Sequence, residues 1–240
     1  MDQKLGNHLL ILDKIVELQN SISQSQQVSL VQQIFLNGFE GQEALLELLV
    51  KRRNIQQLPF NSLDGILFER LYNSELNSIQ QSLKSYFPNG LIQFNSHCNV
   101  DYKRLQTLLI QKQYQKADSL TQLSLCKLVG LGNNSNRNWL YFTDISLIPS
   151  SDLKTIDLLW RLYSMEKFGF SIQRQIWLAN NCDWEKLWTR IGWKRDGIAC
   201  RYPSEFIWSI NAPKGHLPLF NQLRGVQVLS SLFNHTFWNE

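Results

Sequence analysis

Apolar residues recur at intervals of three and four along almost the whole chain, and this spacing restricts the fold more than any other feature. The pattern is clear at Leu153, Ile156, Leu159, Trp160 and Tyr163. Such spacing places apolar side chains on one face of an α-helix, which can then pack against neighbouring helices. Segments in which apolar and polar residues alternate, as in β-strands, are short and rare. The sequence therefore predicts an all-α protein.

The periodic segments fall into two groups. Short helices joined by polar turns are expected over residues 1–86, in a helical-repeat bundle whose sequence has no regular period. Residues 87–100 contain a Pro-Asn-Gly turn and no helical stripe, which predicts a linker. Asp101, a residue type that caps helix N-termini, then opens the second group. The expected division is a bundle over 1–86, a linker over 87–100 and an all-helical domain over 101–240.

Composition restricts the cellular setting. No apolar run approaches the roughly 20 residues of a membrane-spanning helix, and the first 20 residues carry charges inside their apolar stretch, unlike a signal peptide. The cysteines lie far apart, at positions 98, 126, 182 and 200, so we expect reduced thiols and no zinc site. Asn, Gln and Ile are abundant and Ala is scarce, which suits an AT-rich genome. The genome of a plastid is one example.

Positive charge and tryptophan are concentrated in the second group of helices. Residues 101–240 hold 17 Lys and Arg against 11 Asp and Glu, and they contain all 8 tryptophans. This combination suits an aromatic or apolar anionic ligand. A large core beneath a charged surface has the same composition, so both interpretations stay open.

The segment WTRIGWKRDGIACRYPSEFIW, residues 188–208, interleaves aromatic rings with cations around an Asp-Gly turn. Three interpretations fit it. The segment could clamp a small flat ligand, anchor a buried aromatic cluster beneath solvated charges, or form a platform for single-stranded nucleic acid. Trp193 and Trp208 are expected to lie in the core.

Catalytic motifs are not found. The loop GLGNN at residues 130–134 follows no strand and lacks the Gly-Lys-Ser of a phosphate-binding loop, and no nucleophile elbow occurs. Acidic residues are too dispersed for a magnesium site. His216, in APKGHLP, is the one candidate for an axial ligand or an acid. The alternative is a loop histidine that makes hydrogen bonds. We therefore expect no catalytic and no metal-binding residues.

Several segments in the second group carry a family resemblance. NRNWLYFTDI, LKTIDLLWRLYS, KFGFSIQRQIWLA, KLWTRIGWK and NAPKGHLPLFNQLRGVQV follow one another between residues 136 and 228. In this order they resemble the porphyrin-binding accessory proteins of magnesium chelatase, the family named after the fourth genomes-uncoupled locus of plants. The resemblance covers essentially residues 100–238. The first group resembles the helical bundle that cyanobacterial and algal members place before the porphyrin-binding core.

The resemblance implies an all-helical core shaped like a cupped hand that binds protoporphyrin IX and Mg-protoporphyrin IX. It also implies a non-catalytic regulator that stimulates magnesium chelatase, with the chelatase H subunit as partner. The same expectation includes a plastid-encoded plastid protein, with the cyanobacterial cytoplasm as the alternative location. It also includes peripheral association with thylakoid or envelope membranes and no binding of nucleic acid. The competing class is a basic, aromatic adaptor that binds nucleic acid or another protein and takes no tetrapyrrole.

The resemblance also implies a set of binding residues. An apolar wall would remove the flat face of the porphyrin from water, while rim cations would meet its two propionates. This chain departs from the family pattern at Ala199, where relatives carry a tryptophan, and at Gln227, where they carry an arginine. Both departures are expected to weaken binding. The wall residues are Phe142, Ile145, Ile198, Tyr202 and Phe206, and the rim residues are Arg224 and Arg201.

Overall fold

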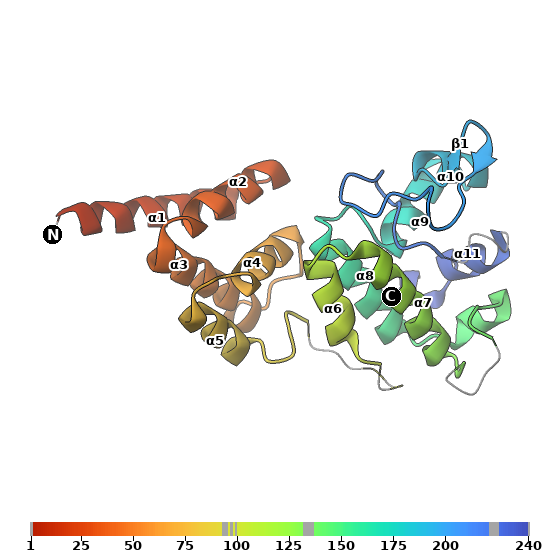
Figure 1. The fold of residues 1–240 in the computed structure, drawn as a ribbon, viewed down its shortest axis with the longest axis horizontal. Coiled ribbons are helices and arrows are strands. Elements are labelled where there is room, and N and C mark those ends of the chain that lie inside the picture. Colours follow the sequence, from red (N-terminus) through yellow and green to blue (C-terminus); the bar gives the residue numbers. More distant parts are fainter. Residues whose placement is uncertain are drawn as a thin grey trace. The chain divides into compact units, whose positions relative to one another are not determined.

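The computed structural model describes residues 2–92, 96, 98, 100–131, 137–220 and 226–239. The chain divides into two units, Met1–Gln93 and Phe94–Glu240 (Figure 1). Helices make up most of both units, which confirms the predicted class. One small two-stranded sheet in the second unit departs from an entirely helical domain. Among the residues with described positions, no helix is long and apolar enough to cross a membrane.

The first unit is a succession of packed helices in which α3 contacts α1, α2, α4 and α5. Its core consists of aliphatic side chains such as Leu18, Val31, Ile34, Leu45 and Leu67, which are fully buried. The π-helical segment η1 follows α3 without a break. The elements are α1 (Asp2–Asn20), α2 (Gln24–Phe35), α3 (Gly38–Val50), η1 (Lys51–Ile55), α4 (Ser62–Tyr72) and α5 (Asn77–Tyr86).

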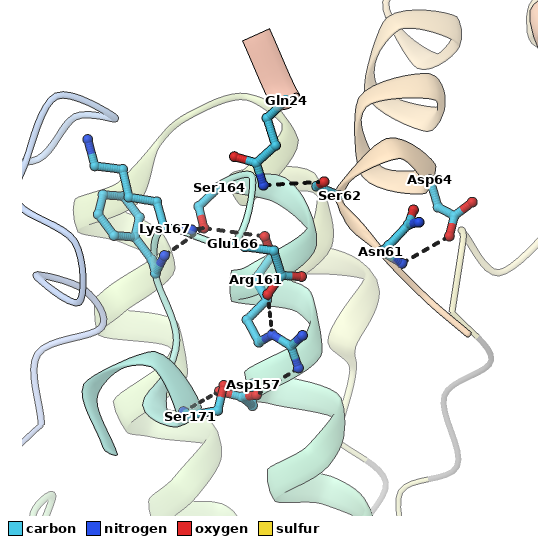
Figure 2. A network of polar contacts seen from close by, with 11 residues as sticks. Gln24, Asn61, Ser62, Asp64, Asp157, Arg161, Ser164, Glu166, Lys167 and Ser171 are labelled. Carbon is cyan, nitrogen blue, oxygen red and sulfur yellow. Dashed lines mark hydrogen bonds and ion pairs between the residues drawn. The ribbon is translucent and has the colours of Figure 1, made fainter. Parts of the chain in front are cut away.

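A buried ion pair joins η1 to the start of α4. Arg52 Nε donates to Asp64 Oδ1 at 2.7 Å. The Asn61 N–H donates to Asp64 Oδ2 at 3.1 Å, and this hydrogen bond is drawn in Figure 2. Both oxygens of this fully buried carboxylate therefore have partners. A paired and hydrogen-bonded charge can lie in a core where an isolated charge could not.

Helix α3 approaches α2 so closely that Gly41 has no room for a side chain. A Cβ atom at this position would lie 1.9 Å from the carbonyl oxygen of Ile34. We expect Gly41→Ala to lower the free energy of unfolding of the first unit by about 1–3 kcal/mol, because the two backbones must separate. Urea denaturation followed by circular dichroism measures the loss.

The matched control is Gly6→Ala on α1, where a Cβ atom would meet no other atom within 4 Å. Alanine favours helices over glycine, so this variant is expected to be as stable as the wild type or slightly more so. Equal unfolding midpoints for Gly41→Ala and Gly6→Ala would contradict the close packing of α2 and α3.

The second unit packs helices around an aromatic cluster. Trp160 stacks on Tyr114, with ring centroids 6.2 Å apart, and Phe168 meets Tyr114 edge-on at 5.4 Å. Asp101 caps α6, as predicted, by accepting the Lys103 N–H at 2.9 Å. The elements are α6 (Tyr102–Ile110), α7 (Tyr114–Leu128), η2 (Phe142–Leu147), α8 (Ser150–Tyr163), α9 (Phe170–Ala179), α10 (Trp184–Arg190), β1 (Lys194–Arg195), β2 (Ile198–Ala199), α11 (Val226–Phe233) and η4 (Thr236–Asn239).

A polar network fixes the turn between α8 and α9 (Figure 2). Arg161 Nε donates to Glu166 at 2.6 Å, and its Nη1 atom lies 3.8 Å from Asp157. Asp157 also accepts the Ser171 N–H at 2.8 Å, at the first turn of α9. Burial raises the pKa of Asp157 despite these partners. The network sets where α9 begins, and α9 supplies a residue to the site described below.

Candidate functional site

The predicted Asp-Gly turn is the tip of a short β-hairpin. Asp196 and Gly197 have φ angles of 48° and 79°. Strands β1 and β2 pair antiparallel, with Arg195 opposite Ile198. Positive φ at both central residues is typical of a type I′ turn, whose twist matches that of the flanking strands. Each strand has two residues, too few to produce the alternation by which strands are predicted.

The segment that follows the turn, residues 198–208, is called the clamp loop below. Ile198 and Tyr202 are 70% and 46% exposed, whereas Phe206 is 5% exposed. The Tyr202 ring meets the Trp208 ring edge-on at 6.0 Å, and Trp208 Nε1 donates to the Pro203 carbonyl at 3.0 Å. Trp208 is only partly buried, which corrects its predicted place in the core. The clamp loop therefore presents apolar and aromatic surface to solvent, with Phe206 beneath.

Cations accompany this apolar surface. Arg201 is exposed, and within the described part of the chain its guanidinium takes part in no ion pair. Its backbone N–H donates to Glu205 Oε2 at 2.7 Å, and Arg195 Nη2 donates to the Glu205 carbonyl at 3.1 Å. Glu205 thus orders the loop backbone and leaves the Arg201 side chain available to an anionic group.

The other predicted wall residues lie on η2, which packs against α11 (Figure 1). Phe142 is 50% exposed and Ile145 is 1% exposed. Asp144 fixes the shape of η2, because it accepts from Arg137 at 2.8 Å and from the Tyr141 N–H at 2.7 Å. Burial opposes ionisation of Asp144, but these two donors outweigh it and lower its pKa.

The predicted binding residues thus differ in exposure. Phe142, Ile198, Tyr202 and Arg201 are available to a ligand, whereas Ile145 and Phe206 lie in the core. The predicted rim residue Arg224 lies outside the described residues. Sequence spacing could not separate exposed from buried members, because η2 and the clamp loop are too short and irregular to show periodicity.

His216 connects the clamp loop to the interior. The side chain is fully buried, Nε2 accepts the Ile207 N–H at 3.0 Å, and Nδ1 lies 2.6 Å from the Ile191 carbonyl oxygen. Trp193, itself in the core as predicted, donates from Nε1 to the His216 carbonyl at 2.8 Å. The structure thus supports the hydrogen-bonded alternative for His216, since both ring nitrogens are engaged by backbone groups.

Burial lowers the pKa of His216, the hydrogen bond to Ile191 opposes this shift, and the positive charge of Arg195 adds to it. The ring is therefore neutral near pH 7. The Ile191 carbonyl oxygen can only accept, so Nδ1 carries the proton. Nε2 has its lone pair free to accept from Ile207.

Two more buried side chains hold the loop after α10. Gln173, on α9, donates from Nε2 to the carbonyls of Gly215 and Pro218 at 2.9 and 2.8 Å. Asp118, on α7, accepts the Leu219 N–H at 2.6 Å. Burial raises the pKa of Asp118 to about 8. Residues far apart in the sequence therefore fix the segment 209–220, which has no regular secondary structure of its own.

The first unit also has a pocket, which sequence reasoning did not predict. Its volume is about 610 Å³, and residues of η1, the segment before α4 and the end of α5 line it, among them Arg53, Phe60 and Tyr86. The Arg53 guanidinium lies over the Phe60 ring, 3.5 Å from its centroid. Within the described ranges no group of three or more His, Cys, Asp or Glu could hold a metal ion.

Two family models match the chain, one in each unit. The model described as an ARM-like repeat domain, GUN4-N terminal, matches residues 12–88, and the GUN4-like model matches residues 95–236. A Pyropia yezoensis protein named uncharacterized protein ycf53 is 44% identical over 238 residues, which cover 99% of each chain.

Two further relatives match part of the chain. The chloroplastic tetrapyrrole-binding protein of Arabidopsis thaliana is 34% identical over 140 residues, covering 55% of this chain and 52% of that protein. The solved structure of GUN4 from Chlamydomonas reinhardtii is 38% identical to this chain, and the two superpose with a TM-score of 0.56. The match covers 61% of this chain and 95% of the C. reinhardtii chain. With one model on each unit and a relative matching along almost its whole length, the chain belongs to the GUN4-like family, as the sequence resemblance indicated.

Proposed function

We propose that the second unit binds protoporphyrin IX and Mg-protoporphyrin IX through the exposed residues of the clamp loop and through Phe142 of η2. The observation that carries the proposal is the exposure of Ile198 and Tyr202 together with that of Arg201, whose guanidinium makes no ion pair among the residues that the structure describes. The name of the A. thaliana relative, a tetrapyrrole-binding protein, supports the same ligand class.

The chemistry of the surface suits this ligand. A porphyrin is a flat, mostly apolar disc, and covering it stabilises the complex by about 25 cal/mol for each Å² of apolar surface removed from water. Arg201, with Arg224 as the second proposed rim residue, would pair with the propionates while staying partly hydrated. Ile145 and Phe206 support the surface from the core. Ala199 removes one aromatic contact that relatives have.

The proposed role is a non-catalytic one. The protein would shield the porphyrin and stimulate magnesium chelatase through contact with its H subunit, in a plastid or in a cyanobacterium. The matches to a ycf53 protein and to a chloroplastic relative support that setting. Peripheral association with photosynthetic membranes would place the protein near the chelatase.

Tyr202→Ala is expected to weaken porphyrin binding about three- to tenfold, because one aromatic contact contributes about 0.5–1.5 kcal/mol. Quenching of porphyrin fluorescence measures the dissociation constant. Leu123→Ala on α7, which removes a 58% exposed leucine, is the matched control and is expected to leave binding unchanged. Identical titration curves for all three proteins would place the site elsewhere.

The role in chelatase stimulation needs its own test. The wild-type protein is expected to accelerate magnesium insertion by the purified chelatase. At limiting porphyrin, Tyr202→Ala is expected to accelerate it less than the wild type does. Porphyrin binding without any effect on turnover would leave a carrier and reject the activator. Oligonucleotide binding that weakens steeply with salt, without porphyrin binding, would favour the nucleic-acid adaptor instead.

A further inference from the structure

The end of the clamp loop reaches the buried interior through one imidazole. The Ile207 N–H donates to His216 Nε2, whose ring is fixed in turn by the Ile191 carbonyl. Among the described residues, the other bonds of the clamp loop lie within the loop, as from the Phe206 N–H to the Pro203 carbonyl, or join it to the hairpin and the residues just before the hairpin, as from Cys200 Sγ to the Gly192 carbonyl at 3.5 Å. The His216 ring also packs against the Phe206 ring, with centroids 5.6 Å apart. The position of the backbone that carries Tyr202 and Trp208 therefore depends directly on where the His216 ring lies and which of its nitrogens carries hydrogen.

We infer that His216 is the positioning residue of the clamp loop: its neutral ring holds the loop at Ile207, and protonation of the ring releases the loop and weakens ligand binding. The inference deepens the proposed function and rests on it for the ligand. A protonated imidazole carries hydrogen on both nitrogens. Nε2–H would then point at the Ile207 N–H, so the bond that anchors the loop would be replaced by a contact between two donors.

The surroundings of His216 disfavour its charged form. Arg195 on β1 acts on the ring through its positive charge. The other charged groups on the segments packed against the ring are mostly cationic. Arg190 at the end of α10 is bonded to Asn180, and Glu185 on the same helix pairs with Lys194 of β1. Lys167 Nζ donates to the Ile210 carbonyl, and Glu205 accepts the backbone N–H of Arg201. Other charged side chains on these segments are exposed, namely Lys214, Arg201 and Asp196.

The direction of the pH effect follows from this lowered pKa. Neutral His216 contributes stability that is fully present above the ordinary histidine pKa of about 6.5, and that is lost as pH falls through the lower pKa of the folded protein. The clamp loop is therefore held at neutral pH and released in acid. A loop that is held for one tenth of the time lowers the apparent affinity about tenfold.

The decisive measurement uses the ligand-free full chain, so that it does not depend on porphyrin binding. Nitrogen-15 NMR of the histidine rings is expected to show the Nδ1–H tautomer of His216 near pH 7.5. As pH falls, exchange of the Ile207 amide, corrected for its intrinsic rate, is expected to become about tenfold faster with the same midpoint as the His216 titration. Continued protection of the Ile207 amide after His216 has titrated would overturn the inference, as would an Nε2–H tautomer near neutral pH.

Two substitutions separate positioning from general packing. His216→Gln can place an amide oxygen near Nε2, where it accepts the Ile207 N–H but does not titrate. Its porphyrin affinity is expected to match the wild type near pH 7.5 and to stay higher in acid, by about five- to tenfold. His216→Asn is too short to reach and is expected to bind about five- to tenfold more weakly throughout.

His235 offers a matched control, because its ring is also buried between backbone groups. Nδ1 accepts the Phe237 N–H at 3.1 Å, and Nε2 lies 3.0 Å from the Ile148 carbonyl. His235→Gln is expected to keep the wild-type pH profile of binding. The same porphyrin is used throughout, so ionisation of its propionates cancels between variants.

Coinciding pH profiles of porphyrin binding for the wild type and His216→Gln would overturn the inference. A wild type that binds no porphyrin at any pH would reject the proposed function, while the NMR titration would still decide the role of His216.

Discussion

Asp118→Asn is expected to abolish a loss of stability that the wild-type protein undergoes as pH rises from about 4 to about 8. Asp118 is buried on α7 and accepts the Leu219 N–H at 2.6 Å. Burial raises its pKa from 3.8 to about 8. Between these values the folded protein holds a proton that the unfolded chain has released, so stability falls as pH increases. An asparagine keeps an acceptor oxygen for Leu219 and carries no charge at any pH.

The expected effect is large. A shift of this size corresponds to about 6 kcal/mol of unfolding free energy over the whole pH range, of which about 4 kcal/mol is lost between about pH 5 and about pH 8. Urea denaturation of the wild type and Asp118→Asn at about pH 5 and about pH 8 measures it. Asp196→Asn is the control, because an Asn-Gly pair forms the same type I′ turn and the position is exposed. Parallel pH profiles for the wild type and Asp118→Asn would show that the folded carboxyl is not held neutral.

Asp118 and His216 act on stability in opposite directions. Asp118 costs stability as pH rises, whereas neutral His216 contributes stability that is lost in acid. The double variant Asp118→Asn, His216→Gln is therefore expected to have a flatter profile than either single variant. A urea series across this pH range separates the two contributions.

Trp160→Ala is expected to lower the free energy of unfolding of the second unit by about 3–5 kcal/mol. The side chain is fully buried, stacks on Tyr114 and donates from Nε1 to Thr121 Oγ1 at 3.0 Å. Truncation would leave a large cavity between α7 and α8 and break the aromatic cluster. Chemical denaturation followed by circular dichroism measures the loss.

Trp160→Phe is the matched control for this cavity. It keeps most of the ring volume and loses the indole N–H, and Thr121 still donates to the Ala117 carbonyl at 2.8 Å. Its loss is expected to be less than half that of the alanine variant. A Trp160→Ala protein that unfolds at the wild-type midpoint would contradict the role of this cluster as the centre of the core.

The features that could be predicted from the sequence are those that depend on interactions between residues close together in the chain. The spacing of Leu153, Ile156 and Leu159 marks one face of α8 whatever lies opposite, and all three are buried. Asp101 caps α6 through a bond to a residue two positions away. The turn at Asp196 and Gly197 depends on backbone preferences of those two residues. Each of these signals lies within a few residues.

The candidate site depends instead on contacts between distant segments. The bond from Ile207 to His216 and that from Leu219 to Asp118, 101 residues apart, leave no local pattern. The same holds for the burial of Ile145 and Phe206, because neither η2 nor the clamp loop has a period to read. Family resemblance could name these residues, but only the fold shows which of them reach solvent.

Besides Glu205 and Trp208 of the clamp loop itself, three buried side chains hold the backbone that follows α10. Gln173, His216 and Asp118 bind this backbone, and no side chain on the clamp surface takes part in those bonds. Substitution of Ile198 or Tyr202 should therefore alter which pigment is preferred without changing the path of the main chain. On the proposed function, the pigment preference of this unit can therefore change during evolution while its buried framework stays constant.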